Sequence, residues 1–314
     1  MPFYNGSPYS FKVETILTLK RLPATHVDVS PILPRPEISE LLGIGYRRIP
    51  ILAIGRDIYC DTSLIATVLE RRFPASAGYG TIFPKRANGG RADTGLIKAF
   101  SKFYTDGTLS ACVIPLIPWD KFPAEFIADR SKMLGGPIDP SKFKAIRGRS
   151  LSALSSHLAL VEEQLSDGRF GDVSVYFALK WVQRYPDAID ELFNEGKFAK
   201  TMKWLDDLTA HLESLKADGP KTATIYGKEA ADRIAAASVE EQAPPFDEWT
   251  AGLLGVKRND VVTIRPEDNA RDYPTKGSLV GLSDEEFVLE VKGESGSFLC
   301  HFPRMKYTVE AYNG

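Results

Sequence analysis

The stretch GIGYRRIPILAIGRDIYCDTSLIATVLERRFP, residues 43–74, contains two strands and a helix in close succession. Residues 49–54 form an apolar run, and the turn Gly-Arg-Asp at 55–57 leads into a second short run, which predicts a β-hairpin. Asp61-Thr62-Ser63 then offers three helix-capping residues in front of an apolar helical period that Phe73-Pro74 ends. The stretch therefore predicts strand, strand and helix, the closing half of an α/β unit.

The residues before this stretch supply the other half of the unit. Residues 2–4 form a short apolar strand, and Asn5-Gly6 turns the chain into Ser7-Pro8. Serine at the N-cap and proline at the first helical position predict a helix start. Residues 25–29 alternate like a strand, and a short helix follows them. Residues 2–74 are therefore predicted to have the order βαβαββα, with a short first strand.

The pattern changes twice further along the chain. Residues 75–90 are rich in Gly, Ala and Ser and predict a linker, after which helical periods replace strands as far as residue 215. After Lys257, alternating stretches separated by Gly, Asp and Pro predict a small antiparallel sheet or barrel. The predicted fold class is α/β plus all-α with an added β module, in three units: 1–76, 90–238 and 250–314.

Composition excludes several classes of function. The chain has 314 residues, a formal net charge of -2 and no run of Lys or Arg longer than two, so a nucleic-acid partner is not expected. Three scattered cysteines indicate neither a disulfide framework nor a metal site. No apolar run approaches the roughly 20 residues that span a bilayer, so no membrane association is expected. We therefore expect a cytoplasmic protein without a metal.

Three positions carry the candidate chemistry: Ser7, Ile49-Pro50 and Asp61-Thr62. In a βαβαββα unit they fall at the same end of the sheet. A helix N-terminus there attracts a carboxylate and the Asp61 side chain suits an ammonium, so this end is predicted to hold an α-amino acid head. If the Ile49-Pro50 bond is cis, the Ile49 backbone can pair with an extended ligand. Ser7 and Asp61 also cap helices, so a purely structural role stays open.

These motifs resemble a known family. Ser7-Pro8-Tyr9-Ser10, Ile49-Pro50 and Asp61-Thr62-Ser63-Leu64-Ile65 are similar to the N-terminal domain of glutathione transferases. The resemblance implies a thioredoxin-like N-terminal domain followed by a helical glutathione transferase domain. It also implies glutathione as the co-substrate and a homodimer as the assembly.

A narrower resemblance extends to the end of the chain. Residues 43–74 resemble a fungal subgroup found among natural-product tailoring proteins, and residues 255–262 and 301–304 resemble the C-terminal extension of that subgroup. The β-rich residues 250–314 are then implied to be a module that ordinary transferases lack. The first strand is shorter than the strand of the family, which leaves open whether this N-terminus is native.

The resemblance also assigns roles to single residues. Ser7 corresponds to the serine that hydrogen-bonds the glutathione sulfur, where a hydroxyl and a helix N-terminus favour the thiolate. The residues implied to bind glutathione are Arg48 at the glycyl carboxylate, Ile49 and Pro50 at the cysteinyl backbone, and Asp61 and Thr62 at the γ-glutamyl head. The implied enzyme activates the thiolate for addition to, or isomerisation or elimination on, a hydrophobic electrophile such as a fungal secondary metabolite.

The electrophile pocket is expected above the thiol, mainly from the helical part. Its candidate residues are Tyr9, Phe103, Tyr104, Trp119 and Tyr176.

Two other functions are compatible with a fold of this kind to different degrees. A binding or regulatory protein that kept the fold without turnover is the alternative, because fold alone does not establish function. A thiol-disulfide reductase is not expected, since it needs a reactive cysteine where Ser7 stands.

Overall fold

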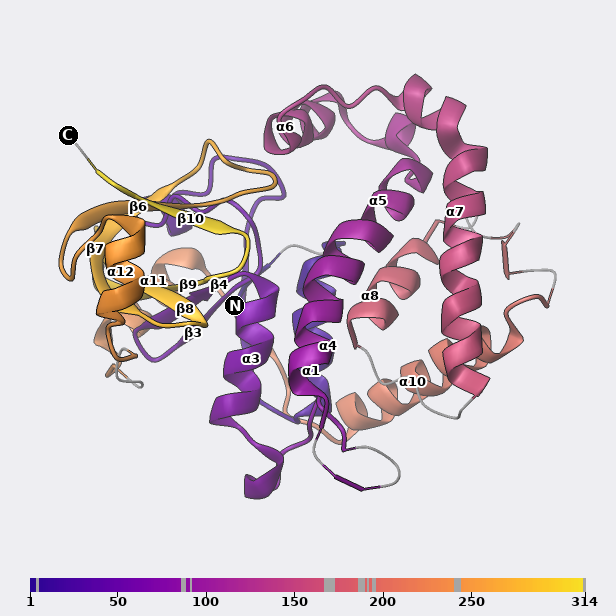
Figure 1. The fold of residues 1–314 in the computed structure, drawn as a ribbon, viewed down its shortest axis with the longest axis horizontal. Coiled ribbons are helices and arrows are strands. Elements are labelled where there is room, and N and C mark those ends of the chain that lie inside the picture. Colours follow the sequence, from indigo (N-terminus) through magenta and orange to yellow (C-terminus); the bar gives the residue numbers. More distant parts are fainter. Residues whose placement is uncertain are drawn as a thin grey trace.

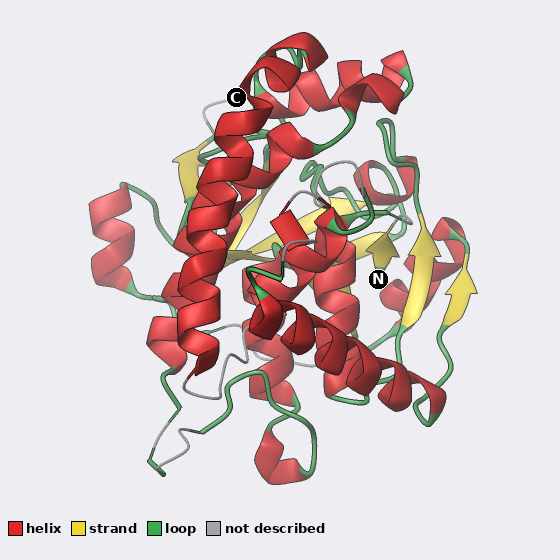
Figure 2. Cartoon of the chain, turned by 90° about the vertical axis from the view of Figure 1, so that its right-hand side faces the viewer, coloured by secondary structure: helices red, strands yellow, loops and turns green. Residues whose placement is uncertain are grey.

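The computed structural model describes residues 1–3, 6–85, 89–90, 92–166, 173–185, 190, 192–193, 196–239 and 244–312. Figure 1 shows the C-terminal strands on one side of the molecule, the long helices on the other, and α1 and α3 between them. From the helical side, the helices stand in front of the strands (Figure 2).

The N-terminal part has the predicted order βαβαββα. Its elements are β1 (Pro2–Phe3), α1 (Pro8–Leu19), β2 (Thr25–Asp28), α2 (Pro36–Ser39), β3 (Ile51–Ile54), β4 (Asp57–Cys60) and α3 (Thr62–Arg72). The two long helices begin where the sequence predicts, because the side chains of Ser7 and Asp61 accept hydrogen bonds from backbone N–H groups of the first turn. Pro8 takes the first helical position, where its missing N–H has no intrahelical partner to lose.

A helical part follows the N-terminal part. Its elements are η1 (Ala75–Ala77), α4 (Thr94–Ala99), the π-helix η2 (Phe100–Leu109), α5 (Ser110–Val113), η3 (Ile114–Leu116), η4 (Trp119–Lys121), α6 (Ala124–Leu134), α7 (Pro140–Ser166), α8 (Val173–Val182) and α10 (Ala199–Ala217). Buried residues of α7 and α8, among them Leu154, Leu158 and Leu179, form its core. Among the described helices, none is both long enough and apolar enough to cross a membrane.

The C-terminal part of the chain contains the predicted antiparallel strands. The elements of this part are β5 (Ala223–Ile225), α11 (Gly227–Ala236), α12 (Glu248–Leu254), β6 (Val261–Pro266), β7 (Thr275–Leu282), β8 (Glu286–Gly293), β9 (Gly296–Pro303) and β10 (Tyr307–Ala311). Strands β6 to β9 pair antiparallel in succession, and β10 pairs antiparallel with β6. Alternating burial along β6 and β10 matches the alternating sequence pattern.

The strands form two sheets, and each sheet joins strands from different predicted units. One has the order β1-β2-β5, and the other has the order β10-β6-β7-β8-β9-β4-β3. Strand β4 pairs in parallel with β9, with Ile58 opposite Cys300. Ile58 and Cys300 belong to one buried cluster with Ile51 and Leu289. The C-terminal strands therefore extend the sheet of the N-terminal hairpin, and the boundaries 1–76, 90–238 and 250–314 stay a prediction.

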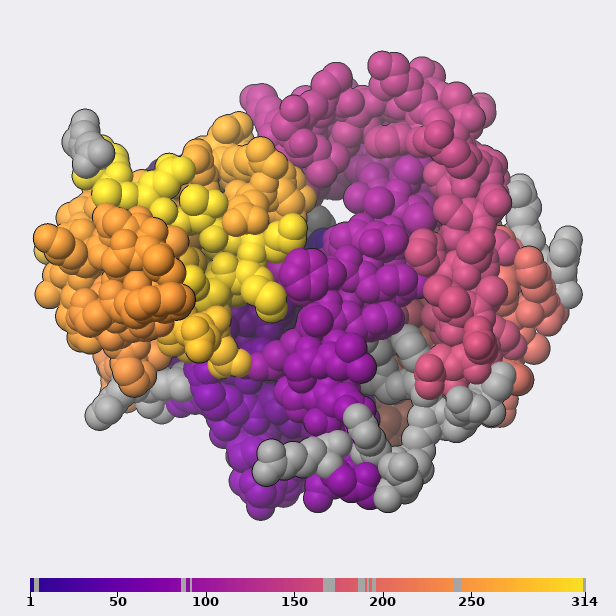
Figure 3. All heavy atoms as spheres, viewed as in Figure 1, coloured from indigo at the N-terminus to yellow at the C-terminus, as the bar shows by residue number. Residues whose placement is uncertain are grey.

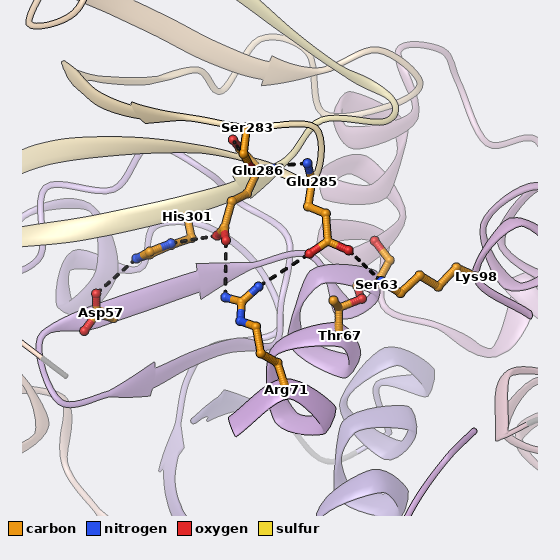
Figure 4. A network of polar contacts seen from close by, with 9 residues as sticks. All are labelled: Asp57, Ser63, Thr67, Arg71, Lys98, Ser283, Glu285, Glu286 and His301. Carbon is orange, nitrogen blue, oxygen red and sulfur yellow. Dashed lines mark hydrogen bonds and ion pairs between the residues drawn. The ribbon is translucent and has the colours of Figure 1, made fainter. Parts of the chain in front are cut away.

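His301 lies at the junction of β4, β8 and β9. Its side chain lies between Asp57 and Glu286, as Figure 4 shows. Its Nε2 is 3.1 Å from Asp57 Oδ1, and its Nδ1 is 2.8 Å from Glu286 Oε2. Arg71 of α3 donates to Glu286 at 3.2 Å. Burial lowers the pKa of His301, but its hydrogen bonds to Asp57 and Glu286 outweigh burial and raise the pKa above its ordinary value. A charged network therefore joins the C-terminal sheet to the N-terminal hairpin and α3.

Candidate functional site

Ser7 lies at the start of α1 with an extended backbone and a buried side chain. Its Oγ accepts a hydrogen bond from the backbone N of Ser10 at 3.2 Å. That contact uses one lone pair and leaves the hydroxyl hydrogen for an acceptor. The indole Nε1 of Trp181 donates to Gly6 O at 3.0 Å, so the helical part contacts the turn before Ser7. The N-terminus of α1 carries partial positive charge, which favours an anion beside Ser7.

Ile49, Pro50 and Thr62 are further candidates for ligand binding. The Ile49–Pro50 peptide bond is cis. The Ile49 side chain is part of the core shared with the C-terminal strands. Thr62 is the first residue of α3, and its side chain is buried. The contacts of these residues with a ligand stay a prediction.

Asp61 caps α3 from a left-handed backbone conformation, with φ of 74°. Its Oδ1 accepts from the backbone N and the Oγ of Ser63, at 2.9 and 2.5 Å. Its Oδ2 accepts from Lys102 Nζ at 3.1 Å. Burial raises the pKa of Asp61, but the Lys102 ammonium and the hydrogen bonds from Ser63 outweigh burial and hold the pKa well below its usual range. Asp61 is therefore an ionised carboxylate in a buried site.

Lys102 belongs to the π-helix η2 and not to the N-terminal part. Its side chain is buried beside Asp61, and its Nζ lies 5.7 Å from the centre of the Tyr307 ring. A second buried pair lies nearby, in which Lys12 Nζ is 3.5 Å from Asp106 Oδ1. Burial raises the pKa of Asp106, and Lys12 opposes that effect. Two lysines and two carboxylates thus meet between α1, α3 and η2.

Tyr307 of the C-terminal strand β10 also lies beside Asp61. Its hydroxyl lies 3.0 Å from Asp61 Oδ2 and 3.2 Å from the hydroxyl of Tyr46. A phenol has one hydrogen to donate, and the carboxylate is the stronger acceptor, so Tyr307 donates to Asp61 and can accept from Tyr46. Burial raises the pKa of both phenols, which keeps them neutral. The C-terminal strands therefore contribute a side chain to the candidate site.

Arg48 is also paired within the chain. Its Nη2 donates to the carboxylate of Asp268 and to the backbone oxygen of Asn269. Both partners lie in the segment between β6 and β7, whose Ala270 also bonds to Met133 O of α6 at 2.7 Å. In Figure 3 an opening lies between the orange C-terminal part and the purple and magenta helices that include α5 and α6. The segment between β6 and β7 thus contacts both Arg48 and helix α6.

The five aromatic residues predicted for the electrophile pocket do not form one group. Tyr9, Tyr104 and Tyr176 share one cluster of the helical part, and Phe103 and Trp119 lie outside it. Tyr9 packs against Phe177 with ring centres 5.6 Å apart, and burial raises the pKa of its phenol. Phe103 is 50% exposed. The hydroxyls of Tyr104 and Tyr176 bond to His157 at 2.9 Å and to Thr209 at 3.0 Å, within the helical core. Trp119 lies in a separate buried cluster with Ile117 and Ile138. Their role in substrate binding stays a prediction.

Sequence reasoning missed several residues of this site, among them Lys102, Tyr307 and Asp268. Lys102 lies off the apolar positions of its helix, where an exposed lysine is the ordinary expectation, so no local signal marks it. No local signal marks Tyr307 or Asp268 either, because their partners lie more than two hundred residues away in the chain.

Comparison with known proteins supports the N-terminal assignment. Residues 2–77 match the model of the glutathione S-transferase N-terminal domain. Residues 112–217 match a domain of unknown function, DUF7962. No curated protein matches the chain by sequence.

Solved structures are similar to this chain to different degrees. A GST-like protein from Pseudomonas syringae has a TM-score of 0.70 and 22% identity, with 99% of this chain and 98% of that chain covered. Rice GST1 in complex with glutathione has a TM-score of 0.45 and 16% identity, with 74% of this chain and 93% of that chain covered. A glutathione S-transferase from Rhodospirillum rubrum has a TM-score of 0.46 and 15% identity, with 78% and 94% covered.

The fold of this chain is therefore that of glutathione S-transferases. It has a thioredoxin-like N-terminal domain, a helical region and a C-terminal sheet of antiparallel strands. Because the Pseudomonas syringae likeness covers 99% of this chain, it includes the C-terminal strands.

Proposed function

We propose that this chain is a glutathione transferase-like enzyme. It activates the glutathione thiolate for addition to, or isomerisation or elimination on, a hydrophobic electrophile of the fungal secondary-metabolite class. The observation that carries the proposal is the position of Ser7, a buried hydroxyl at the N-terminus of α1 within the segment that matches the glutathione S-transferase N-terminal domain.

The chemistry follows from what Ser7 can donate. Its hydroxyl hydrogen stabilises the sulfur anion, and the positive end of α1 acts in the same direction. Both effects favour the thiolate over the thiol, so more of the bound co-substrate is in the nucleophilic form near neutral pH. We therefore expect the thiol of bound glutathione to have a lowered pKa, and we assign this effect to Ser7.

A second candidate function is a non-catalytic binding or regulatory protein with the same fold. The observation that favours it is the pairing of Asp61 with Lys102 and of Arg48 with Asp268. These are the two charged residues that the family resemblance assigns to the charged ends of glutathione. In this alternative, glutathione would meet charges at Asp61 and Arg48 that the chain already neutralises.

The test is the variant Ser7→Ala, assayed for conjugation of glutathione to an activated aryl halide and for glutathione affinity by calorimetry. We expect kcat to fall at least about tenfold while Kd changes less than about threefold, because the hydroxyl acts on the thiolate and not on the peptide. Equal kcat in both proteins would remove Ser7 from the mechanism. Glutathione binding without turnover in the wild type would favour the second candidate.

Two further variants separate chemistry from helix capping. Ser7→Ala also removes an N-cap, which costs about 1 kcal/mol of stability. Asp247→Ala removes the side-chain cap of α12, far along the chain, and is expected to lower stability without lowering kcat. Ser7→Thr keeps both the cap and the hydroxyl and is expected to keep most of the activity.

The remaining expectations are proposals of the same kind. We propose a cytoplasmic homodimer with units at 1–76, 90–238 and 250–314, in which the last unit shares a sheet with the first. The electrophile is proposed to contact Tyr9, Phe103, Tyr104, Trp119 or Tyr176. Sedimentation analysis of the purified chain tests the dimer.

A further inference from the structure

Strands β1 and β3 are each the end strand of their sheet. In the part of the chain that the structure describes, one sheet has the order β1-β2-β5 and the other ends in β9-β4-β3, so β1 and β3 each have one free edge. Strand β3 pairs with β4 across a two-residue turn, with Ile54 opposite Asp57. The closing pair of such a hairpin is hydrogen-bonded and the next pair is not, so the N–H and C=O of Ala53 point to the free edge. A free edge of this kind can pair with another strand.

A cavity of about 510 Å³ borders both free edges. Pro2 of β1 and all four residues of β3 line it. Tyr79 and Arg233 also line it and are exposed, so the cavity opens to solvent. Its volume lies in the usual range of ligand pockets. The lining includes neither Ser7 nor any other residue assigned to glutathione, so this is a separate site.

The cavity joins two hydrophobic clusters that lie on opposite faces of β3. Ile51 belongs to the cluster shared with α11 and the C-terminal strands, and Leu52 belongs to the cluster of α1 and α3. Successive side chains of a strand point to opposite faces, so the strand lies between the two clusters. Ala231 of the first cluster and Leu69 of the second both line the cavity. The cavity therefore passes through the plane of the strands from one face to the other.

The lining determines what kind of molecule can fill this cavity. An empty apolar cavity lowers stability in proportion to its volume, and water finds few hydrogen-bond partners against a lining that is mostly apolar. A small apolar molecule would cover the side chains on both faces but would leave the two strand edges unpaired. An extended peptide covers both, because its side chains alternate between two faces and its backbone groups point sideways to the edges.

We propose that this cavity binds an extended apolar segment of a partner polypeptide as a strand between β1 and β3. The segment has about four apolar residues, since β3 has four. Its side chains pack alternately against the cluster of α1 and α3 and against the cluster that includes α11, and its backbone pairs with the N–H and C=O of Ala53. The site does not depend on the proposed function, because glutathione and this segment contact different residues.

Four peptides test the proposal by fluorescence anisotropy on the full wild-type chain. They are a labelled, end-blocked Lys-Val-Ile-Val-Leu-Lys, two forms of it that carry N-methyl groups on alternate residues in the two possible registers, and Lys-Ser-Ser-Ser-Ser-Lys. We expect saturable binding of the first peptide. The N-methylated forms keep the side chains and lose backbone donors, so they should bind at least about tenfold more weakly, and the serine peptide should not bind.

Three results of this series would overturn the proposal. The first is no saturable binding of the unmodified peptide. The second is equal binding of the N-methylated forms, because burial of side chains alone would then explain the affinity. The third is binding of decanoate, a small apolar molecule without a peptide backbone, as tightly as the peptide.

A proline variant assigns the pairing to the edge of β3. Ala53→Pro removes the N–H that points to the free edge and keeps the ladder with β4, so we expect the peptide to bind about fivefold more weakly. The matched control is Ala311→Pro in β10, the strand at the other end of the same sheet. Because Tyr312 N donates to Val261 O, the N–H of Ala311 points away from β6, and its loss should leave the affinity unchanged.

Equal affinity of Ala53→Pro and the wild type would overturn the proposal. Because proline can distort β3, circular dichroism checks that the variant folds, and the N-methylated peptides on the wild type give the independent measurement. Sedimentation with and without the peptide identifies a second copy of this chain as the occupant if saturating peptide converts a dimer into monomers. That result would overturn the assignment to a separate partner.

Discussion

Arg48 forms an ion pair with Asp268, which lies 220 residues further along the chain. The pair joins the loop before β3 to the segment between β6 and β7. Arg48 is the residue that the family resemblance assigns to the glycyl carboxylate of glutathione. The C-terminal part therefore supplies a carboxylate to the same guanidinium that the ligand is expected to bind.

Removal of this carboxylate is expected to strengthen glutathione binding. In Asp268→Ala the guanidinium of Arg48 loses its internal partner, so the ligand carboxylate no longer competes with it. We expect Kd for glutathione to fall about two- to fivefold in calorimetry, the range of one partly exposed ion pair. Glu310→Ala, which removes the exposed pair with Arg265 on the same sheet, is the control and should leave Kd unchanged. An unchanged Kd in Asp268→Ala would show that the pair does not compete with the ligand.

Tyr307 is expected to stabilise the site through its hydroxyl. Tyr307→Phe removes the hydrogen bond to Asp61 and leaves that buried carboxylate with one fewer donor. The free energy of unfolding in urea should fall by about 1–2 kcal/mol. Tyr312→Phe removes a hydroxyl from a tyrosine that directly follows β10 and is 45% exposed, and should change stability by less than about 0.5 kcal/mol. Equal stability of the two variants would contradict the assigned hydrogen bond.

The network at His301 predicts that stability falls as pH rises. The ordinary pKa of the imidazole is 6.5, and its hydrogen bonds to Asp57 and Glu286 raise the pKa in the folded chain. The contribution of the charged imidazole is therefore complete below about pH 6.5 and is lost as pH rises through the folded-state pKa. Arg71 also adjoins this network, where it pairs with Glu285 and Glu286.

Urea unfolding between pH 6 and pH 9 measures this dependence. The free energy of unfolding should fall with rising pH in the wild type and change much less in His301→Gln, which cannot titrate. The variant is also expected to be less stable at pH 6, because Asp57 and Glu286 lose a cationic partner. An identical slope in the two proteins would show that His301 does not titrate in this range.

Removal of the C-terminal strands should unfold the N-terminal hairpin. A chain ended after Ser238 loses β9, the parallel partner of β4, and exposes Ile58, Cys60 and other residues of the shared core. Because that core spans both ends of the chain, we expect no cooperative unfolding transition in circular dichroism for the shortened chain. A cooperative transition close to that of the full chain would show that residues 1–238 fold on their own.

Much of the fold is predictable from local sequence. Ser7-Pro8 and Asp61-Thr62 begin helices in the structure because a cap and its first turn involve only three or four consecutive residues. The alternating stretches after Lys257 form strands for the same reason, since side chains alternate between faces within each strand. The pairing of β4 with β9 was not predictable, because alternation indicates a strand and not its partner.

For the electrophile pocket, residue type predicts burial but not which side chains line a site. Tyr104, Trp119 and Tyr176 are at least partly buried, as aromatic residues on helical faces usually are. Burial alone does not distinguish a ring that packs in a core from one that lines a site. Trp119 and Tyr176 in fact belong to different clusters.

The sequence by itself determined the order of the N-terminal elements, the helix starts at Ser7 and Asp61, and the antiparallel strands at the end of the chain. Only the tertiary structure decided which charges Asp61 and Arg48 meet. Lys102 lies 41 residues from Asp61, and Tyr307 and Asp268 lie 246 and 220 residues from their partners. Capping and alternation act over a few residues, whereas these contacts exist only once helix η2 and the C-terminal sheet pack against the N-terminal part.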